Sequence, residues 1–160
     1  MIKSVLGDAT KQGTKVLAHQ TNCIGVMGAG IARQIKMQLM TVEDFNQYKN
    51  LCKWKGATLL GKVQFLNLEN CILANVFGEN VPTGRKLDTD YNALRTGLIT
   101  VHNYCKENNY DVTIPGLMGC GLAGGDWDYV LNQIIKPIFV DSEVQLTIAY
   151  FEEENFNKYA

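Results

Sequence analysis

The segment "KVLAHQTNCIGVMGAGIARQIKMQL", residues 15–39, decides the fold class of this chain. Its first part, Lys15–His19, is a short apolar run of strand length. Glycines follow, and an apolar stripe at helical spacing then runs through Ile31, Ile35 and Leu39. A strand that leads through a glycine-rich loop into a helix is typical of α/β proteins, so this segment predicts an α/β fold.

A second segment has the same plan. "GLMGCGLAGGDW", residues 116–127, holds five glycines and lies between an apolar run that ends at Pro115 and an amphipathic stretch that begins at Trp127. Glycine loses more conformational freedom on folding than any other residue, so such a cluster needs a physical cause. The loop is either a tight strand-to-helix connection or a place where a ligand comes within hydrogen-bonding distance of bare backbone.

Alternation and helical spacing predict the remaining elements. We expect Asp90 as an N-cap, helices at 42–54, 91–105 and 130–138, and strands at 2–6, 61–67, 70–78, 111–115 and 144–151. This order predicts a mixed sheet that lies between helices. Because the chain shows no repeat, linker or composition shift, we expect a single domain over residues 1–160, with residues 151–160 as a C-terminal tail.

The composition argues against several classes of protein. The 160 residues carry a formal net charge of −1, which disfavours a broad electrostatic surface for nucleic acid or membrane. The five cysteines are odd in number and widely spaced, which favours a reducing compartment over a disulfide framework or a zinc site. No stretch has the pattern of a signal peptide or a membrane span. We therefore expect a cytoplasmic protein (in a host cytoplasm if it comes from a phage) without a metal or a cofactor.

The two glycine loops together predict a phosphate site. Each leaves the carboxyl end of a strand and enters a helix, and ligands bind at that edge in open α/β sheets. Glycine turns and helix N-termini present free N–H groups that suit phosphate oxygens without lysine or arginine. The established nucleotide fingerprints are absent, because "GAGIAR" at 28–33 lacks a third glycine and Gly61-Lys62 is followed by Val63.

Three motifs resemble the macro domain. They are "GDAT" at 7–10, "AHQTNCIGVMGAGIA" at 18–32 and "IPGLMGCGLAGGDW" at 114–127. The similarity is to the branch that contains terminal ADP-ribose glycohydrolase and the yeast-type ADP-ribose-1''-phosphate phosphatase, and it extends from Ile2 to about Phe151. It implies a three-layer α/β/α fold with a mixed central sheet, which binds ADP-ribose in a cleft at the carboxyl edge of that sheet.

The resemblance also implies roles for residues at the two ends of the ligand. Asp8, with Ala9 beside it, would accept a hydrogen bond from the adenine amino group, although a plain turn aspartate is the alternative. Asn22 would contact the distal ribose hydroxyls, or its side chain would bond its own loop. Tyr150 or Phe151 would flank the adenine, or pack in the core.

The phosphate-facing backbone would come from both glycine loops. Side chains at these positions would block the approach of a diphosphate to the amides, which is one explanation for the glycines. Cys120 is expected to be a small packing residue and not a nucleophile. The implied loop residues are Gly28, Ala29, Gly30 and Ile31 in the first loop and Gly119, Cys120, Gly121, Leu122, Ala123 and Gly124 in the second.

The resemblance is weakest at catalysis. The branch that acts on acyl-linked ADP-ribose uses a lysine after the middle strand and an aspartate after "GCGL", whereas this chain has "NVFGEN" at 75–80 and Ala123 there. A covalent lysine–ribose intermediate is therefore not expected. The remaining catalytic candidates are Asp126, which could orient or deprotonate a water or serve only as an N-cap, His19, which could be an acid–base group or structural, and Asn22.

These residues favour an enzyme that hydrolyses an ADP-ribose derivative. Because the lysine and the aspartate are missing, we expect dephosphorylation of ADP-ribose-1''-phosphate ahead of removal of ADP-ribose from a protein or nucleic acid. The alternative is a non-catalytic ADP-ribose reader or sponge. The expected partner is ADP-ribose or a derivative, including an ADP-ribosylated macromolecule, and the sequence does not indicate an oligomeric state.

Overall fold

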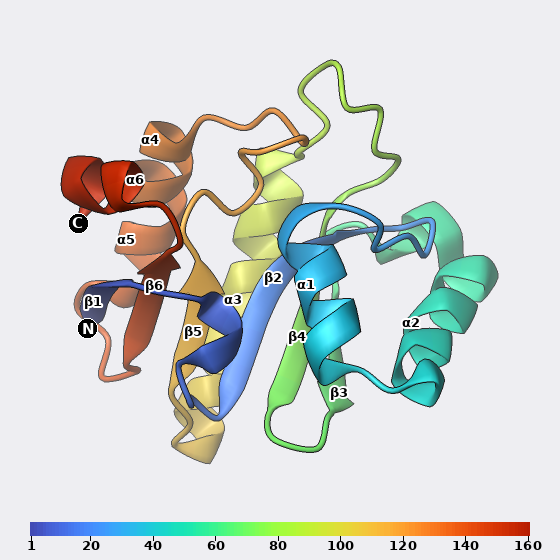
Figure 1. The fold of residues 1–160 in the computed structure, drawn as a ribbon, viewed down its shortest axis with the longest axis horizontal. Helices are drawn as coiled ribbons and strands as arrows, with labels where there is room; N and C mark the ends of the chain where they lie inside the picture. The colour runs from blue at the N-terminus through green and yellow to red at the C-terminus, as the bar shows by residue number, and fades with distance from the viewer.

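A six-stranded mixed sheet forms the centre of the protein (Figure 1). The computed structural model describes all residues from Met1 to Ala160. The strand order is β1-β6-β5-β2-β4-β3, in which only β3 is antiparallel to its neighbour. The strands are β1 (Ile2–Leu6), β2 (Val16–Asn22), β3 (Val63–Asn67), β4 (Ile72–Glu79), β5 (Val112–Pro115) and β6 (Leu146–Tyr150).

Helices cover both faces of the sheet, so the predicted three-layer α/β/α fold is confirmed (Figure 1). On one face α1 and α2 enclose a small core, and on the other α3 and the helix 127–139 enclose a larger one. The α-helices are α1 (Gly30–Leu39), α2 (Val42–Lys55), α3 (Tyr91–Asn108), α4 (Trp127–Tyr129), α5 (Lys136–Phe139) and α6 (Glu153–Tyr159). Short 3-10 helices lie at Ala9–Lys11 and Gly56–Leu59.

Strand β4, which lies between β2 and β3, shows why these residues form this sheet. Ile72, Ala74 and Val76 belong to the larger core, and Leu73 and Phe77 belong to the smaller one. Successive side chains of a strand point to opposite faces. A strand with helices on both sides therefore needs a continuous apolar run, which is what this stretch supplies.

Three details differ from the expectations. β2 does not end at His19 but continues to Asn22, so His19 lies inside the strand. The last helix contains a π-helical segment, Val130–Ile135, between α4 and α5. The expected tail at 151–160 instead contains α6, whose Tyr159 ring stacks on Tyr150 at a centroid distance of 6.4 Å.

No helix is both long and apolar enough to pass through a bilayer.

Candidate ligand-binding cleft

The loops that follow β2, β4 and β5 gather at one edge of the sheet (Figure 1). These three strands are neighbours in the order β5-β2-β4 and run parallel, so their carboxyl ends lie side by side. The first glycine loop joins β2 to α1, the second joins β5 to α4, and the loop 80–90 joins β4 to α3. The predicted position of both glycine loops is therefore confirmed, and a third loop joins them.

The first glycine loop leaves backbone amides open. Gly28, Ala29 and Gly30 are exposed, and Ile31 is partly buried. The N-cap of α1 is Ala29, which has no side chain able to accept from the first turn. Since the first N–H groups of a helix have no partner within it, this end of α1 can donate to an anion.

Asn22 holds this loop in shape. Its Oδ1 accepts hydrogen bonds from the backbone N–H groups of Ile24 and Val26, both at 3.2 Å, and from the Tyr48 hydroxyl at 3.1 Å. Its Nδ2 donates to the Val26 carbonyl at 2.7 Å. The side chain thus bonds its own loop, the alternative weighed for it, and a contact with a distal ribose remains a prediction. Tyr48, which the sequence did not single out, fixes Asn22 from α2.

The second glycine loop folds back on itself. The Gly125 N–H donates to the Gly119 carbonyl at 2.9 Å, and a Cβ added at Gly125 would meet that same oxygen. A Cβ at Gly116 would meet the Tyr150 ring, and one at Gly124 would lie 2.7 Å from the Lys86 carbonyl oxygen. These glycines allow the protein to pack on itself, so access for a ligand is not needed to explain them.

Gly121 is different from those three glycines. It is exposed, and a Cβ added there would meet nothing in the protein within 4 Å. Leu122 beside it is also exposed, whereas Gly119, Cys120 and Ala123 are partly buried. Packing within the protein therefore does not explain Gly121, and room for a ligand stays a prediction for it.

The loop 80–90 closes over the second glycine loop and was missed in the sequence. The N–H groups of Asp88 and Thr89 both donate to the Ala123 carbonyl, at 2.8 and 3.1 Å. The Thr89 hydroxyl donates to the Gly119 carbonyl at 2.6 Å and accepts from Gln20 Nε2 at 2.9 Å. Only the tertiary structure brings these segments together.

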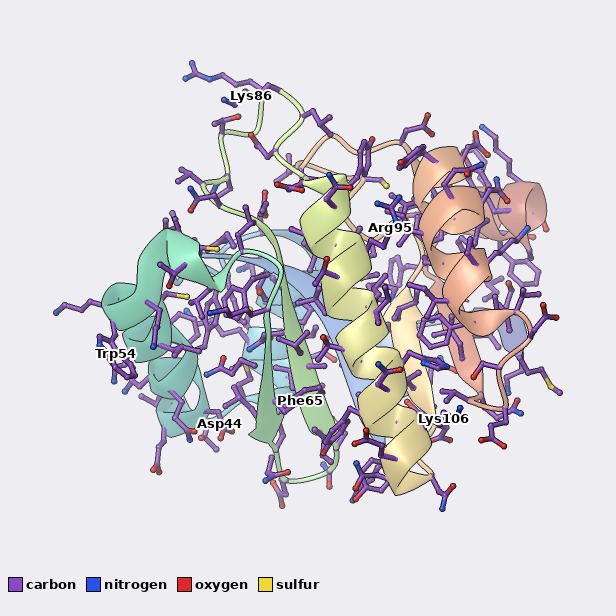
Figure 2. All side chains as sticks on the ribbon, turned by 180° about the vertical axis from the view of Figure 1, so that it is seen from behind. Asp44, Trp54, Phe65, Lys86, Arg95 and Lys106 are labelled. Carbon is purple, nitrogen blue, oxygen red and sulfur yellow. The ribbon has the colours of Figure 1, made fainter.

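The Asp88 carboxylate shapes the rest of that loop. It accepts from the N–H groups of Thr83 and Gly84 at 2.7 and 3.0 Å, and from the Thr83 hydroxyl. Desolvation acts to raise the pKa of Asp88, but these hydrogen bonds outweigh it and hold the pKa below its usual value. Asp88 is therefore ionised at neutral pH. Lys86 projects from the same loop, away from the sheet (Figure 2).

His19 cannot contact a ligand at this edge of the sheet. It is fully buried inside β2, and its Nε2 lies 2.7 Å from Asn75 Oδ1 on the neighbouring strand. Burial lowers the pKa of His19 to about 4, although the hydrogen bond with Asn75 works in the opposite direction. The imidazole is neutral and lies away from the carboxyl edge, so the acid–base role considered for His19 is wrong.

The proposed adenine end is formed by the ends of β1 and β6. The Gly7 N–H donates to the Tyr150 carbonyl at 2.9 Å, which brings Asp8 and Phe151 near each other. Asp8 is partly buried and its Oδ1 accepts from Thr10 N–H and hydroxyl, while Ala9 is buried.

The two aromatic candidates at that end, Tyr150 and Phe151, differ in how far their side chains are buried. The Tyr150 side chain is 1% exposed and its hydroxyl accepts from Trp127 Nε1 at 3.2 Å. It is a core residue, so its suggested place beside the adenine is wrong. Phe151 is 76% exposed and remains the candidate.

Asp126 lies exposed at the start of α4. Its Oδ1 accepts from the Asp128 N–H at 3.0 Å, which confirms the N-cap, and its own N–H donates to the Tyr91 hydroxyl. Burial, with the Asp126 charge nearby, raises the pKa of Cys120 to about 12. The thiol therefore stays protonated, which agrees with a packing role for Cys120.

Glu79 is a further acidic residue at this edge, and the sequence did not single it out within "NVFGEN". It is the last residue of β4 and is paired in register with Asn22. Its Oε2 is inaccessible to solvent and has no hydrogen-bond partner. The signal in the sequence that could have identified Glu79 is an acidic residue at the end of a buried strand.

A hollow of about 460 Å³ lies at the opposite edge of the sheet. It is lined in part by Lys15, Asp111 and Gln145, which directly precede β2, β5 and β6. None of the predicted site residues lines it. It is therefore separate from the carboxyl edge, where the predicted site residues lie.

Comparisons with known proteins agree with this geometry. No model of a known protein family matches the chain. The chain is 31% identical over 139 residues to a DNA ADP-ribosyl glycohydrolase of Mycobacterium tuberculosis, a match that covers 85% of this chain and 38% of that protein. The macrodomain of Mycobacterium tuberculosis DarG has a TM-score of 0.79 at 27% identity, over 93% of this chain and 97% of that one. Thermosipho africanus DarTG, solved in complex with ADP-ribose, has a TM-score of 0.78 at 19% identity. That match covers 96% of this chain and 42% of the Thermosipho chain.

The fold, the two glycine loops and these similarities together define the class: this chain belongs to the macrodomain family. The chain spans 38% of the length of the curated mycobacterial relative. The matched region thus corresponds to one part of that longer protein.

The buried His19 predicts how stability depends on pH. The pKa is about 4 in the folded protein and 6.5 in the unfolded chain, so the unfolded state binds the proton more tightly between these values. The free energy of unfolding should therefore be highest above about pH 6.5, where His19 is neutral in both states. It should fall by about 3 kcal/mol as the pH drops toward about 4. Denaturant unfolding at several pH values measures this loss. His19→Gln should remove most of this pH-dependent loss of stability. A loss of the same size in the variant would show that other groups cause it.

Proposed function

We propose that the cleft at the carboxyl edge binds ADP-ribose. The observation that carries this proposal is the placement of two glycine loops on the adjacent parallel strands β2 and β5, with exposed backbone at Gly28–Gly30 and at Gly121. Such amides can hold a diphosphate without cationic side chains. Asp8 and Phe151 lie at one end of this edge, where they suit an adenine, and Asn22 lies at the β2–β4 end.

We further propose that the protein hydrolyses the bond between ADP-ribose and a macromolecule, with ADP-ribosylated DNA as the first substrate to test. The relatives named DNA ADP-ribosyl glycohydrolase support this choice. Exposed Arg85 and Lys86 lie on the loop that covers the second glycine loop, where they suit a polyanion. Water is the nucleophile in this proposal, because β4 ends in Glu79 and is followed by Asn80 rather than by a lysine.

Dephosphorylation of ADP-ribose-1''-phosphate is the second candidate. It rests on the motif resemblance together with Ala123, which stands where the acyl-specific branch has an aspartate. A reader that binds without turnover would use the same cleft, so binding and turnover must be measured separately. The reducing location expected from the cysteines makes a cytoplasmic protein our proposal for its compartment.

Calorimetric titration with ADP-ribose, beside AMP, ATP and NAD, tests the cleft. We expect ADP-ribose to bind most tightly and, at saturation, to raise the melting temperature, since a ligand specific for the folded state stabilises it. Turnover is then followed on ADP-ribosylated DNA, ADP-ribosylated protein and ADP-ribose-1''-phosphate. Release of free ADP-ribose from DNA is the expected result. Binding without any product would favour a reader that binds ADP-ribose without turnover. Absence of binding would refute the proposed ADP-ribose site.

Two glycine substitutions separate ligand access from packing. Gly121→Ala should leave stability unchanged but weaken ADP-ribose binding by about tenfold, or about 1.4 kcal/mol, since the methyl group enters only the cleft. Gly124→Ala should lower the free energy of unfolding by about 2 kcal/mol, because its φ of +76° is strained for alanine and its Cβ would meet the Lys86 carbonyl. Unfolding and calorimetry measure both. Unchanged affinity in Gly121→Ala would argue against phosphate near that residue.

Asp126 is proposed to orient the water or the ribose in addition to capping α4. Asparagine caps as well as aspartate, whereas alanine costs about 1 kcal/mol. Asp126→Asn should therefore keep the melting temperature and lower kcat about tenfold, and Asp126→Ala should lower both. Full activity in Asp126→Asn would show that Asp126 only caps α4 and has no role in turnover.

A further inference from the structure

Glu79 occupies an irregular point of the sheet. Thr21 pairs with Phe77 and the next residue, Asn22, pairs with Glu79, so Gly78 is an extra residue in β4. A bulge of this kind bends a strand and redirects its side chains, and bulges are frequent next to active sites. The Gln20 carboxamide occupies the space that a Cβ at Gly78 would need. The bulge therefore sets Glu79 opposite Asn22 at the carboxyl edge of the sheet.

The carboxylate of Glu79 is costly for the fold. The residue is partly buried, and Oε2 has neither solvent contact nor a hydrogen-bond partner. Burying a charged group without partners opposes folding. His19 Nδ1 and Gln20 Oε1 are buried without a partner too, but both belong to neutral groups, whereas Oε2 belongs to a carboxylate. Natural proteins tolerate such a cost where function needs the group.

The surroundings make Glu79 a stronger base than a surface glutamate. Burial raises its pKa, and the negative charge of Asp88 on the loop 80–90 raises it further. The other titratable groups on this side are Cys23 after β2 and, beyond it, Tyr48 and Cys52 on α2. Burial raises the pKa of all three, so they are neutral at neutral pH and Asp88 is the charged neighbour.

We propose that Glu79 is the general base of the hydrolysis proposed above. Its carboxylate takes a proton from a water molecule, whose oxygen forms a bond to the anomeric carbon of the distal ribose. The bond from that carbon to the macromolecule breaks, and the leaving group takes the electron pair. The proton then passes from Glu79 to the leaving group, so the products are ADP-ribose and the unmodified macromolecule, and Glu79 returns to its ionised form. This inference rests on the proposed function.

The other candidates at this edge are less suited to accept that proton. Asp126 is exposed and one of its oxygens already accepts from Asp128. His19 is buried inside β2, and Cys120 bonds the Met118 carbonyl within its own loop. Neither oxygen of the Glu79 carboxylate has a hydrogen-bond partner and only Oε2 is closed to solvent, so Oε1 can contact a water molecule beside Asn22, the residue proposed for the distal ribose.

The test compares Glu79→Gln and Glu79→Asp with Glu69→Gln, a matched control at an exposed position before β4. On the substrate that the wild type turns over, Glu79→Gln should lower kcat by at least about 100-fold. ADP-ribose affinity should change by less than about threefold. Glu79→Asp should restore part of kcat, and Glu69→Gln should resemble the wild type.

Two further readouts exclude a merely structural role. A base must be ionised, so kcat of the wild type should fall as the pH drops through the raised pKa of Glu79, and Glu79→Gln should lose this dependence. A raised pKa in the folded state means that the ionised group opposes folding at neutral pH, so the glutamine variant should melt no lower than the wild type.

The outcomes distinguish this inference from the proposed function. Wild-type turnover that persists within threefold in Glu79→Gln, or an unchanged acid limb in that variant, overturns the role of Glu79 alone. A kcat loss that is matched by a loss of ADP-ribose affinity or a lower melting temperature also overturns it, in favour of a structural role. Absence of turnover in the wild type, with ADP-ribose still bound, refutes the hydrolysis itself and this inference with it.

Discussion

Parallel pairing of β5, β2 and β4 is the constraint on which the rest of this structure depends. Parallel strands bring carboxyl ends together, so each connection to the next helix must begin at the same edge. That geometry places the two glycine loops and the loop 80–90 side by side, although they are far apart in the chain. The shared edge is a consequence of the strand order, and the loops supply the groups that a ligand there would contact.

Backbone hydrogen bonding then holds the three loops in one arrangement. The carbonyl groups of Gly119 and Ala123 are taken by Thr89 and Asp88, while the amides at the start of α1 have no side-chain cap. Acceptors are thus satisfied within the protein and donors are left for a ligand. This asymmetry suits an anion, and it explains how a protein of nearly neutral net charge can hold a diphosphate.

Burial divides the polar residues near the cleft into two kinds. The side chains of His19, Asn22 and Tyr150 are buried and each makes a hydrogen bond within the protein, so they stabilise the fold. His19 Nδ1, Gln20 Oε1 and Glu79 Oε2 are all buried without a partner, but of these three atoms only the Glu79 oxygen belongs to a carboxylate. An unsatisfied carboxylate beside the ribose end of the cleft has a cost that packing does not explain. Glu79 rather than His19 carries the proposed chemistry because it is partly buried at the end of β4, whereas His19 is fully buried inside β2.

The sequence by itself determined the layered α/β architecture, the strand-to-helix position of both glycine loops and the caps at Asp90 and Asp126. These features depend on local periodicity and on side chains that bond their near neighbours, which a linear sequence displays. Only the tertiary structure decided that His19 and Tyr150 are buried, that residues 153–159 form a helix against the sheet, and that Glu79 faces Asn22. Those facts depend on strand register and on contacts between distant segments. A bulge of one residue changes which side chain reaches the cleft, and no local pattern records it.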